Sequence, residues 1–558
     1  MEERKELLAS KVLDALRVIA SSKGVRLPEG YAVLLERPRR ENQGDWATNS
    51  AMKLAKLFGA RPIDLAAEIA GAIDRGADIE SIEVAPPGFI NFKLSANWIA
   101  DVIGRAVSLG SDYGRNETGA SRRVQVEFVS ANPTGPIHLG HGRGAAVGDV
   151  MSSVLEFSGW EVEREYYIND AGLQMDNLGK STQSRYFARL GREEAAPFPE
   201  DGYPGDYIDE IAGRILAEHG ESLADKPLGE TLPFFRDETA RSVLGMIRRD
   251  LSDFGVEFDV WFSEKSLYDD DLVPRTIERL KGRDYAYDQD GAVWFRSTSF
   301  GDDKDRVMIR NNGVPTYFTS DIAYLQNKYE RGFDFLIYVW GADHHGYVPR
   351  IRSVNKALGE SDESLEVMLI QFVSLLRNGV PVSMSKRAGT FVTLREVMDE
   401  VGRDASRFSF VNRKCDSHLE FDLEVAKRTS SENPVYYVQY AYARISSILR
   451  EAEAKGVTAP RAEDADFDLL THQAEARLVK EISRFPEEVL KAAENLEPHR
   501  IAYFATSISE AFHSFYNTLK VLVDDERLMK SRLILVDAAR ITIGNALRML
   551  GIRAPERM

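Results

Sequence analysis

A pair of histidines stands three residues apart in the segment Pro136-Ile-His-Leu-Gly-His-Gly142. If this segment opens a helix, His138 and His141 lie on one side of its first turn, where both can donate hydrogen bonds to phosphate oxygens. Gly140 and Gly142 carry no side chain, so a flat purine could pack close to the backbone. A single histidine here would more often cap and pack a helix. The pair with its glycines instead favours a nucleotide site.

A second candidate segment is Asn378-Gly-Val-Pro-Val-Ser-Met-Ser-Lys-Arg-Ala-Gly-Thr390. Its adjacent cations, Lys386 and Arg387, stand beside Ser383 and Ser385 in a glycine-flanked loop, which could stabilise the charge of a leaving pyrophosphate. A lysine in such a loop is by itself more often simply solvated. The functional reading therefore depends on the histidine motif.

The elements around the histidine motif form a strand–turn–helix–strand unit. Apolar residues at 124, 126 and 128 begin a strand that ends in the turn 130–136, and a helix from about 138 to 157 leads to a second strand at 161–168. Such a unit predicts a parallel sheet with a right-handed crossover, whose ligands bind beyond the carboxyl ends of the strands. Apolar runs at 335–340 and 367–373 predict further strands buried on both faces.

The flanking regions have other patterns. Amphipathic helices at 4–20 and 50–74 and a strand with a turn at 82–94 predict a small α+β domain over 1–110. A parallel-sheet domain follows at 120–375, interrupted by an acidic, Gly- and Pro-punctuated insertion at about 175–300. Residues 376–430 contain the cationic loop, and residues 431–558 have a helical pattern.

Composition restricts the class of protein further. The 558 residues carry a formal net charge of −17, with 43% hydrophobic and 28% charged residues, as in ordinary globular chains. The single cysteine, Cys415, excludes a disulfide framework and cysteine-based metal sites. The charged amino terminus and the lack of long apolar runs predict a cytoplasmic protein without membrane spans.

Together the two motifs resemble the HIGH and KMSKS signatures of class I aminoacyl-tRNA synthetases. His138-Leu-Gly-His141 matches the first, and Ser383-Met-Ser-Lys-Arg387 resembles the second, with Ser383 and Arg387 replacing the family's first lysine and last serine. Further segments resemble bacterial-type arginyl-tRNA synthetase: Gly44–Asn49, Pro87–Asn91, Glu127–His141, Tyr167–Gln174, Tyr203–Ile208, Pro315–Asp321, Gly341–Tyr347 and Asn545–Arg548.

This resemblance implies an α/β fold: a class I Rossmann-type parallel-sheet catalytic core with an insertion, a small α+β N-terminal domain that contacts tRNA, and an all-α C-terminal anticodon-binding domain. The implied activity is that of an arginine–tRNA ligase, which forms arginyl-adenylate and pyrophosphate from L-arginine and ATP. It then transfers arginine to the 3′-terminal adenosine of tRNA(Arg). Mg²⁺ would accompany ATP, and a monomer without a structural metal is expected.

The resemblance also assigns site residues. His138, His141 and Lys386 would be catalytic. Arginine would be held by Glu127, Asn132, Glu264, Tyr317, Asp321 and His344, and the tRNA by Tyr440 and Arg444. ATP would be bound by Ala131, Asn132, Pro133, Thr134, Gly135, Pro136, Ile137, His138, Leu139, Gly140, His141, Met384, Ser385 and Lys386.

The residue chemistry agrees with an arginine substrate. A guanidinium needs carboxylates and hydroxyl acceptors in a planar arrangement, and Tyr317 and Asp321 would point the same way from one helix. Asp321 could instead cap that helix. His344 and His345 could be read as a metal pair, although adjacent residues rarely both ligate one ion.

Two sets of residues are candidates for contact with tRNA. Tyrosines at 436, 437, 440 and 442, with Arg444, could stack on anticodon bases or belong to a core. A basic surface made of Arg37, Arg39, Arg40, Lys53 and Lys56 is a further hypothesis, and a solvated face is its alternative. Two other functions stay open, another nucleotidyltransferase with the same histidine turn and a non-catalytic tRNA-binding paralogue.

Overall fold

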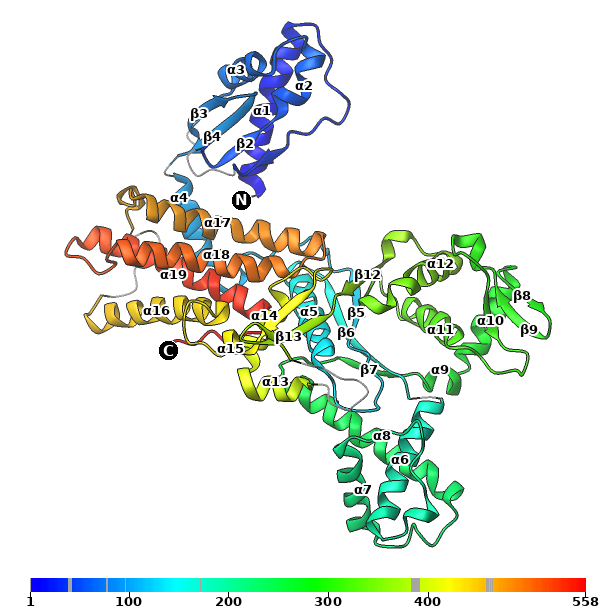
Figure 1. Cartoon of the computed structure of the whole chain (residues 1–558). Helices are drawn as coiled ribbons and strands as arrows, with labels where there is room; N and C mark the ends of the chain where they lie inside the picture. Colours follow the sequence, from blue (N-terminus) through cyan, green and yellow to red (C-terminus); the bar gives the residue numbers. More distant parts are fainter. Residues whose placement is uncertain are drawn as a thin grey trace.

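The computed structural model (Figure 1) describes residues 2–38, 43–76, 79–95, 97–170, 172–382, 392–457, 461, 463 and 465–558. At its centre is a five-stranded sheet with the strand order β12-β11-β5-β6-β7, in which every pair of neighbours is parallel. Its strands are β5 (Arg123–Phe128), β6 (Glu161–Ile168), β7 (Val260–Ser263), β11 (Phe335–Gly341) and β12 (Leu365–Ile370). The predicted parallel sheet is therefore present.

The strand order reverses beside β5. Helix α5 (Leu139–Phe157) leads from β5 to β6 and packs against β5, β6 and β11, whereas β11 and β12 lie on the other side of β5. The short helix η5 (Ala342–Tyr347) and helix α12 (Val348–Leu358) connect β11 to β12. Because ligands of open α/β sheets bind where the order reverses, the crevice beyond β5 and β11 is the expected site.

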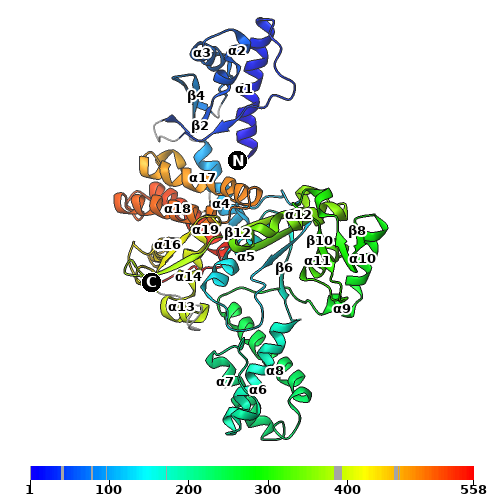
Figure 2. The same ribbon diagram turned by 45° about the vertical axis from the view of Figure 1, so that its right-hand side comes forward.

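Two excursions leave the sheet (Figure 2). The first contains α6 (Leu173–Arg189), α7 (Asp206–His219) and α8 (Leu228–Asp253). The second contains α9 (Ser266–Asp269), α10 (Leu272–Gly282), β8 (Ala286–Gln289), β9 (Ala292–Phe295), β10 (Arg306–Ile309) and α11 (Tyr317–Glu330). The expectation of one insertion at about 175–300 is thus corrected, because β7 of the central sheet lies within it. This strand has only four half-buried residues, too few to stand out as an apolar run.

The N-terminal unit is the predicted small α+β arrangement. Helices α1 (Glu2–Ser22), α2 (Ser50–Phe58) and α3 (Pro62–Ala72) accompany an antiparallel sheet of order β1-β2-β4-β3. The strands are β1 (Leu35–Glu36), β2 (Trp46–Thr48), β3 (Ile79–Ala85) and β4 (Phe89–Leu94). The stretch 50–74, expected as one helix, is two, because Gly59 ends α2 in the left-handed region and Pro62 begins α3.

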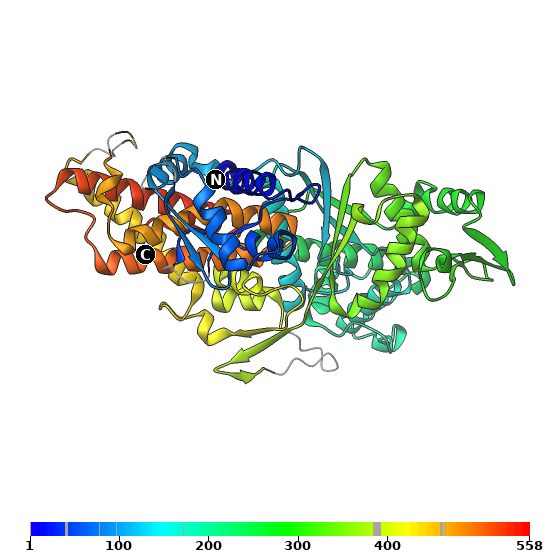
Figure 3. The same ribbon diagram turned by 90° about the horizontal axis from the view of Figure 1, so that it is seen from above.

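The C-terminal unit is all-helical, as predicted. It contains α16 (Pro434–Ala454), α17 (Gln473–Glu494), α18 (His499–Thr518) and α19 (Glu526–Met549). Helix α4 (Asn97–Leu109) falls inside the predicted N-terminal domain, yet it packs against α17 and α19. Seen from above, these helices and the second excursion lie at opposite ends of the molecule (Figure 3).

A small region joins the sheet to this bundle. It contains β13 (Val373–Arg377), β14 (Val380–Pro381), α13 (Leu394–Val401), α14 (Arg403–Val411), β15 (Leu419–Asp422) and α15 (Leu423–Ala426). The fully buried Arg407 of α14 pairs with Asp149 of α5 and donates to the carbonyls of Phe254, Gly255 and Leu550. One guanidinium therefore connects the core, the first excursion and the end of α19.

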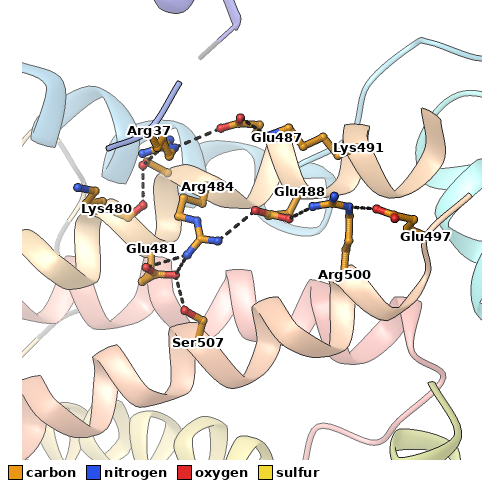
Figure 4. Close-up of polar contacts among 11 residues, drawn as sticks. Arg37, Lys480, Glu481, Arg484, Glu487, Glu488, Lys491, Glu497, Arg500 and Ser507 are labelled. Carbon is orange, nitrogen blue, oxygen red and sulfur yellow. Dashed lines mark hydrogen bonds and ion pairs between the residues drawn. The ribbon is translucent and has the colours of Figure 1, made fainter. Parts of the chain in front are cut away.

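The N-terminal unit contacts α17 through charged groups (Figure 4). Nε of Arg37 lies 3.2 Å from Oε2 of Glu487, and its Nη2 donates to Oγ of Ser483 at 3.3 Å. Lys480 donates from Nζ to the carbonyl of Gly44 at 3.4 Å. Loop residues of the small domain are thus joined directly to the helical bundle.

These contacts remove one residue, Arg37, from the predicted basic surface that would face tRNA. The side chain of Arg37 is only 14% exposed and is engaged between the two units. Lys53 and Lys56 are exposed on α2, as that hypothesis requires. Arg39 and Arg40 lie outside the described residues. Within the part of the chain that the structure describes, no helix is long and apolar enough to cross a bilayer.

Candidate active site

Both motif histidines lie at the N-terminus of α5. Nδ1 of His138 accepts a hydrogen bond from the backbone N–H of Gly140 at 3.1 Å, and Nδ1 of His141 accepts one from the N–H of His138 at 3.4 Å. The two rings stack with their centroids 3.8 Å apart. The pair therefore does cap the helix, as the simpler reading of the sequence proposed.

This capping also prepares the rings for an anion. Because each Nδ1 accepts from a backbone N–H, each neutral ring carries its own proton on Nε2. Both rings then offer an Nε2–H donor at a helix N-terminus, where the backbone dipoles favour phosphate. Capping and phosphate binding are compatible uses of the same two side chains.

The turn between β5 and α5 is held from both sides. Val129 and Ser130 adopt φ of 67° and 39°, in the left-handed region that non-glycine residues take uncommonly. The carbonyl of Ala131 accepts from the Tyr166 hydroxyl at 2.7 Å, and that of Thr134 accepts from Tyr207.

The remaining predicted ATP-binding residues follow along this turn. Asn132 donates from Nδ2 to Oε1 of Gln174 at 2.8 Å. Pro133, Ile137 and Leu139 are buried, Gly135 and Pro136 are half-buried, and Gly140 is exposed. The structure therefore places the predicted residues from 131 to 141 on one continuous turn and helix start.

The predicted residues Met384, Ser385 and Lys386 lie outside the described residues, as do Ser383 and Arg387. The chain on the carboxyl side of this segment is fixed beside the histidine motif. Leu394 donates from its backbone N–H to the carbonyl of Ile137 at 2.9 Å, and Leu139 donates to the carbonyl of Val392 at 3.3 Å.

A cavity of about 500 Å³ opens at the carboxyl ends of β5 and β11. It lies where the strand order reverses, as expected for an α/β sheet. Four of the six predicted arginine-binding residues line it: Glu127, Tyr317, Asp321 and His344. The wall also includes Tyr167, Tyr324, Tyr338, Trp340, Tyr347, Arg310 and Arg350. The cavity therefore combines acids with aromatic faces, which suits a planar cation.

Asp321 is the carboxylate of the cavity that departs most from ordinary behaviour. Burial, together with the charges of Glu264 and Glu127, raises its pKa to about 7, against the opposing effect of a hydrogen bond from the Tyr347 hydroxyl. The alternative of helix capping does not hold, since Asp321 is the fifth residue of α11. Among the described side chains none of the basic groups forms an ion pair with this carboxylate, and a bound guanidinium would supply that positive charge.

Glu264 is only 3% exposed and follows β7 directly. Burial raises its pKa, and hydrogen bonds with Ser320 and Tyr167 oppose that rise. It does not line the cavity itself, but Tyr167 and Ser320 connect it to the cavity wall and to α11. Glu264 therefore lies behind the cavity wall, on the same side of the cavity as Asp321.

Glu127 has a different environment at the end of β5. Its Oε2 accepts from Nζ of Lys328 at 2.6 Å, and its Oε1 accepts from Oγ of Ser130 at 3.0 Å. Oγ of Ser130 also accepts the backbone N–H of Tyr167 at 3.1 Å. The carboxylate is therefore fixed in position while one of its edges borders the cavity.

Two arginines, Arg310 and Arg350, complete the cavity wall and were not predicted from the sequence. Arg310 is exposed and Arg350 half-buried. They could hold an anion such as an α-carboxylate or phosphate. His344 is exposed and lies 3.6 Å from Asp343 through Nε2. Among the described side chains, no group of three His, Cys, Asp or Glu residues could hold a metal ion.

The predicted tRNA-contacting residues Tyr440 and Arg444 lie on α16, beside side chains of α18 that were not predicted. The Arg444 guanidinium lies 5.9 Å from the ring centroid of Tyr440 and 4.7 Å from that of Tyr516. Tyr440 also stacks with His513 at 5.7 Å. Tyr442, in contrast, is partly buried against the core and adjoins Gly544, so the core reading applies to it.

Sequence reasoning missed Lys328 and Tyr347 because tertiary packing, and no local pattern, brings them to the site. Lys328 meets a carboxylate 201 positions away, and no local pattern marks it. Tyr347 stands in the segment Gly341–Tyr347, where the histidines drew the functional assignment. The only available signal for Lys328 was its position two helical turns after Asp321, which was expected to bind arginine.

Comparison with known families agrees with these observations. The family described as "tRNA synthetases class I (R), catalytic domain" matches residues 104–422. "Arginyl tRNA synthetase N terminal domain" matches 6–94, and "DALR anticodon binding domain" matches 438–558. The sheet, the motif-bearing turn and these matches define a class I aminoacyl-tRNA synthetase.

Whole-chain relatives narrow the class. The chain is 52% identical to "Arginine--tRNA ligase" of Syntrophotalea carbinolica, covering 94% of both chains, and 45% identical to that of Heliobacterium modesticaldum, covering all of both. The chain therefore belongs to the arginyl-tRNA synthetase family, and the predicted family and ligase activity are confirmed. The arginyl-tRNA synthetase of Thermus thermophilus shares the fold, with a TM-score of 0.74 over 99% of this chain and 100% of that chain at 22% identity.

Proposed function

We propose that the cavity beyond β5 and β11 binds L-arginine and that the α5 N-terminus binds the phosphates of Mg–ATP. The observation that carries this proposal is the acid- and tyrosine-lined cavity beside the paired histidines, both reached from the carboxyl end of β5. Asp321 and Tyr317 take the guanidinium, with Glu264 behind them adding negative potential. Glu127 and Asn132 take the α-ammonium group.

In the first step, the arginine carboxylate attacks the α-phosphorus of ATP, giving arginyl-adenylate and pyrophosphate. His138 and His141 donate from Nε2 to phosphate oxygens, and Lys386 stabilises the departing pyrophosphate. Arg310 or Arg350 orients the carboxylate, for which an arginine fork is suited. The enzyme forms no covalent intermediate, so positioning and charge stabilisation account for the rate enhancement.

In the second step, the terminal adenosine hydroxyl of tRNA(Arg) attacks the carbonyl carbon of arginyl-adenylate, the acyl–phosphate bond breaks, and AMP leaves. The platform of Tyr440, Arg444, Tyr516 and His513 is suited to stacking on splayed bases of the anticodon loop. We infer that the enzyme acts as a cytoplasmic monomer, and sedimentation at micromolar concentration tests its oligomeric state.

Amino-acid-dependent exchange of pyrophosphate into ATP, measured with each of the twenty amino acids, tests the proposed function. We expect exchange with arginine alone, and stronger exchange when tRNA is present. Matched reactions with Asp321→Asn show whether the cavity is the amino-acid site. Exchange with another amino acid would overturn the substrate assignment. Nucleotide binding without any exchange would favour the nucleotidyltransferase or paralogue alternatives.

A further inference from the structure

A buried ion pair lies behind the arginine cavity. Nζ of Lys328 donates to Oε2 of Glu127 at 2.6 Å, and the two residues are 1% and 5% exposed. The same ammonium lies 4.3 Å from the ring centroid of Tyr324 and 3.9 Å from that of Tyr338. Two aromatic faces and one carboxylate therefore fix its position.

Lys328 does not border the cavity, although Glu127 and both tyrosines do. It is consequently not a substrate contact. Its place in the chain is informative, because it stands on α11, the helix that also carries Asp321. Seven residues separate the two, which is about 10 Å along a helix axis. The ion pair thus connects the helix that presents Asp321 to the strand that presents Glu127.

These two carboxylates face opposite ends of the same substrate in the proposed function, on which this inference rests. We propose that Lys328 is a positioning residue that fixes the spacing between Glu127 and Asp321, and thereby selects an amino acid with the side-chain length of arginine. A buried ion pair often adds little net stability but can specify one arrangement of its neighbours. Here the specified arrangement is the distance of α11 from β5.

A second ion pair on the same helix provides the comparison. Arg331 follows the last residue of α11 and lies 2.6 Å from Glu165 of β6 through Nη2. This pair also anchors the end of α11 to the sheet, and neither of its residues lines the cavity, although Glu165 also accepts from the hydroxyl of Tyr324, which does. A substitution at Arg331 therefore reports the effect of loosening the helix in general.

Changing the length of the side chain at 328 tests the proposal. Lys328→Arg keeps the charge with a longer, planar group, and Lys328→Gln keeps a donor on a shorter chain. Adenylate formation is measured with arginine, with homoarginine, which is one methylene longer, and with the analogue one methylene shorter. One methylene in a fitted pocket is worth about 10- to 200-fold in kcat/KM.

We expect Lys328→Arg to reduce the preference for arginine over homoarginine at least about tenfold, mainly through KM, and Lys328→Gln to favour the shorter analogue. Arg331→Lys should lower the urea midpoint and leave both preferences unchanged. Unaltered preferences in either folded Lys328 variant would overturn the proposal. Aggregation of both, with Arg331→Lys soluble, would assign Lys328 a purely structural role. If Asp321→Asn leaves arginine use unchanged, the proposed site itself fails.

Discussion

Asp321→Asn is expected to weaken arginine binding and at the same time to stabilise the folded protein. Burial raises the pKa of this carboxyl to about 7, even though the Tyr347 hydroxyl donates to it. A guanidinium is always charged, so its tight binding requires the ionised carboxylate. Asparagine keeps the shape and can accept the hydrogen bond from Tyr347, but it cannot carry the charge.

The magnitude for arginine binding follows from the lost charge. A hydrogen bond to a charged group contributes about 1.5–3 kcal/mol, so the KM for arginine at pH 8.5 should rise about 10- to 150-fold. In the wild-type enzyme, Asp321 is about nine-tenths protonated at pH 6, which alone raises KM about tenfold relative to pH 8. The difference between variant and wild type should therefore shrink about tenfold as pH falls to 6.

The effect on stability has the opposite sign. An acid with a raised pKa in the folded state contributes stability in its neutral form, and this contribution is lost as pH rises from about 4 to about 7. The difference between a pKa of about 7 in the folded state and 3.8 in the unfolded state corresponds to about 4 kcal/mol. Because solvent partly reaches the side chain, the expected change in the free energy of unfolding is about 2 kcal/mol. Without arginine at pH 8, Asp321→Asn should consequently resist urea better than the wild-type enzyme.

Two measurements check this reasoning. Arginine-dependent pyrophosphate exchange is recorded from pH 6 to 8.5 with saturating tRNA, and urea unfolding is recorded at pH 8 without substrate. His344 also lines the cavity, so the profile is repeated in His344→Asn. A KM for arginine that is flat over this range in both His344 backgrounds would refute the assignment of Asp321. So would a variant KM within threefold of wild type at pH 8.5.

Three other variants test separate parts of the structure. His138→Asn keeps an acceptor for the helix cap but loses the Nε2 donor, so kcat for adenylate formation should fall about 100-fold with an unchanged urea midpoint. Arg37→Glu should expose the junction between the N-terminal unit and α17 to limited proteolysis. Adding the compensating Glu487→Arg should restore protection, and a double variant that is cleaved as fast as Arg37→Glu would contradict the ion-pair role. Arg444→Ala should raise the KM for tRNA about 5- to 100-fold while leaving the KM for ATP unchanged, whereas parallel losses in both would indicate a folding defect rather than a tRNA contact.

Much of the fold could be predicted because its elements have strong local patterns. The strand predicted at 161–168 is β6 with the same bounds, and the run 335–340 is β11 with one added residue. The run 367–373, predicted as one strand, contains the end of β12 at Ile370 and the first residue of β13 at Val373, because only the polar Gln371 interrupts the apolar residues there. Likewise β7, with four half-buried residues, belongs to the sheet only through its pairing with β6.

The candidate site was predictable where its residues stand in motifs and unpredictable where tertiary packing creates it. His138 and His141 follow a strand and open a helix, so their spacing alone indicated one shared face. The assignment of Arg37 to a tRNA-facing surface was wrong because charge in a sequence does not show the partner, here a carboxylate 450 positions away. The pairing of Lys328 with Glu127 is hidden for the same reason.

The strained turn after β5 shows why the two halves of the site depend on each other. Ser130, at φ of 39°, donates to Glu127 and accepts the backbone N–H of Tyr167, so its hydroxyl fixes the head-group acid and the neighbouring strand together. Two residues further on, Asn132 lies in the turn that leads to His138 at the start of α5. A strained backbone conformation that costs about 1–3 kcal/mol persists only where several surrounding contacts hold it in place. Relaxing this turn would move the ammonium site relative to the phosphate site, and the carboxylate that must reach the α-phosphorus lies between them.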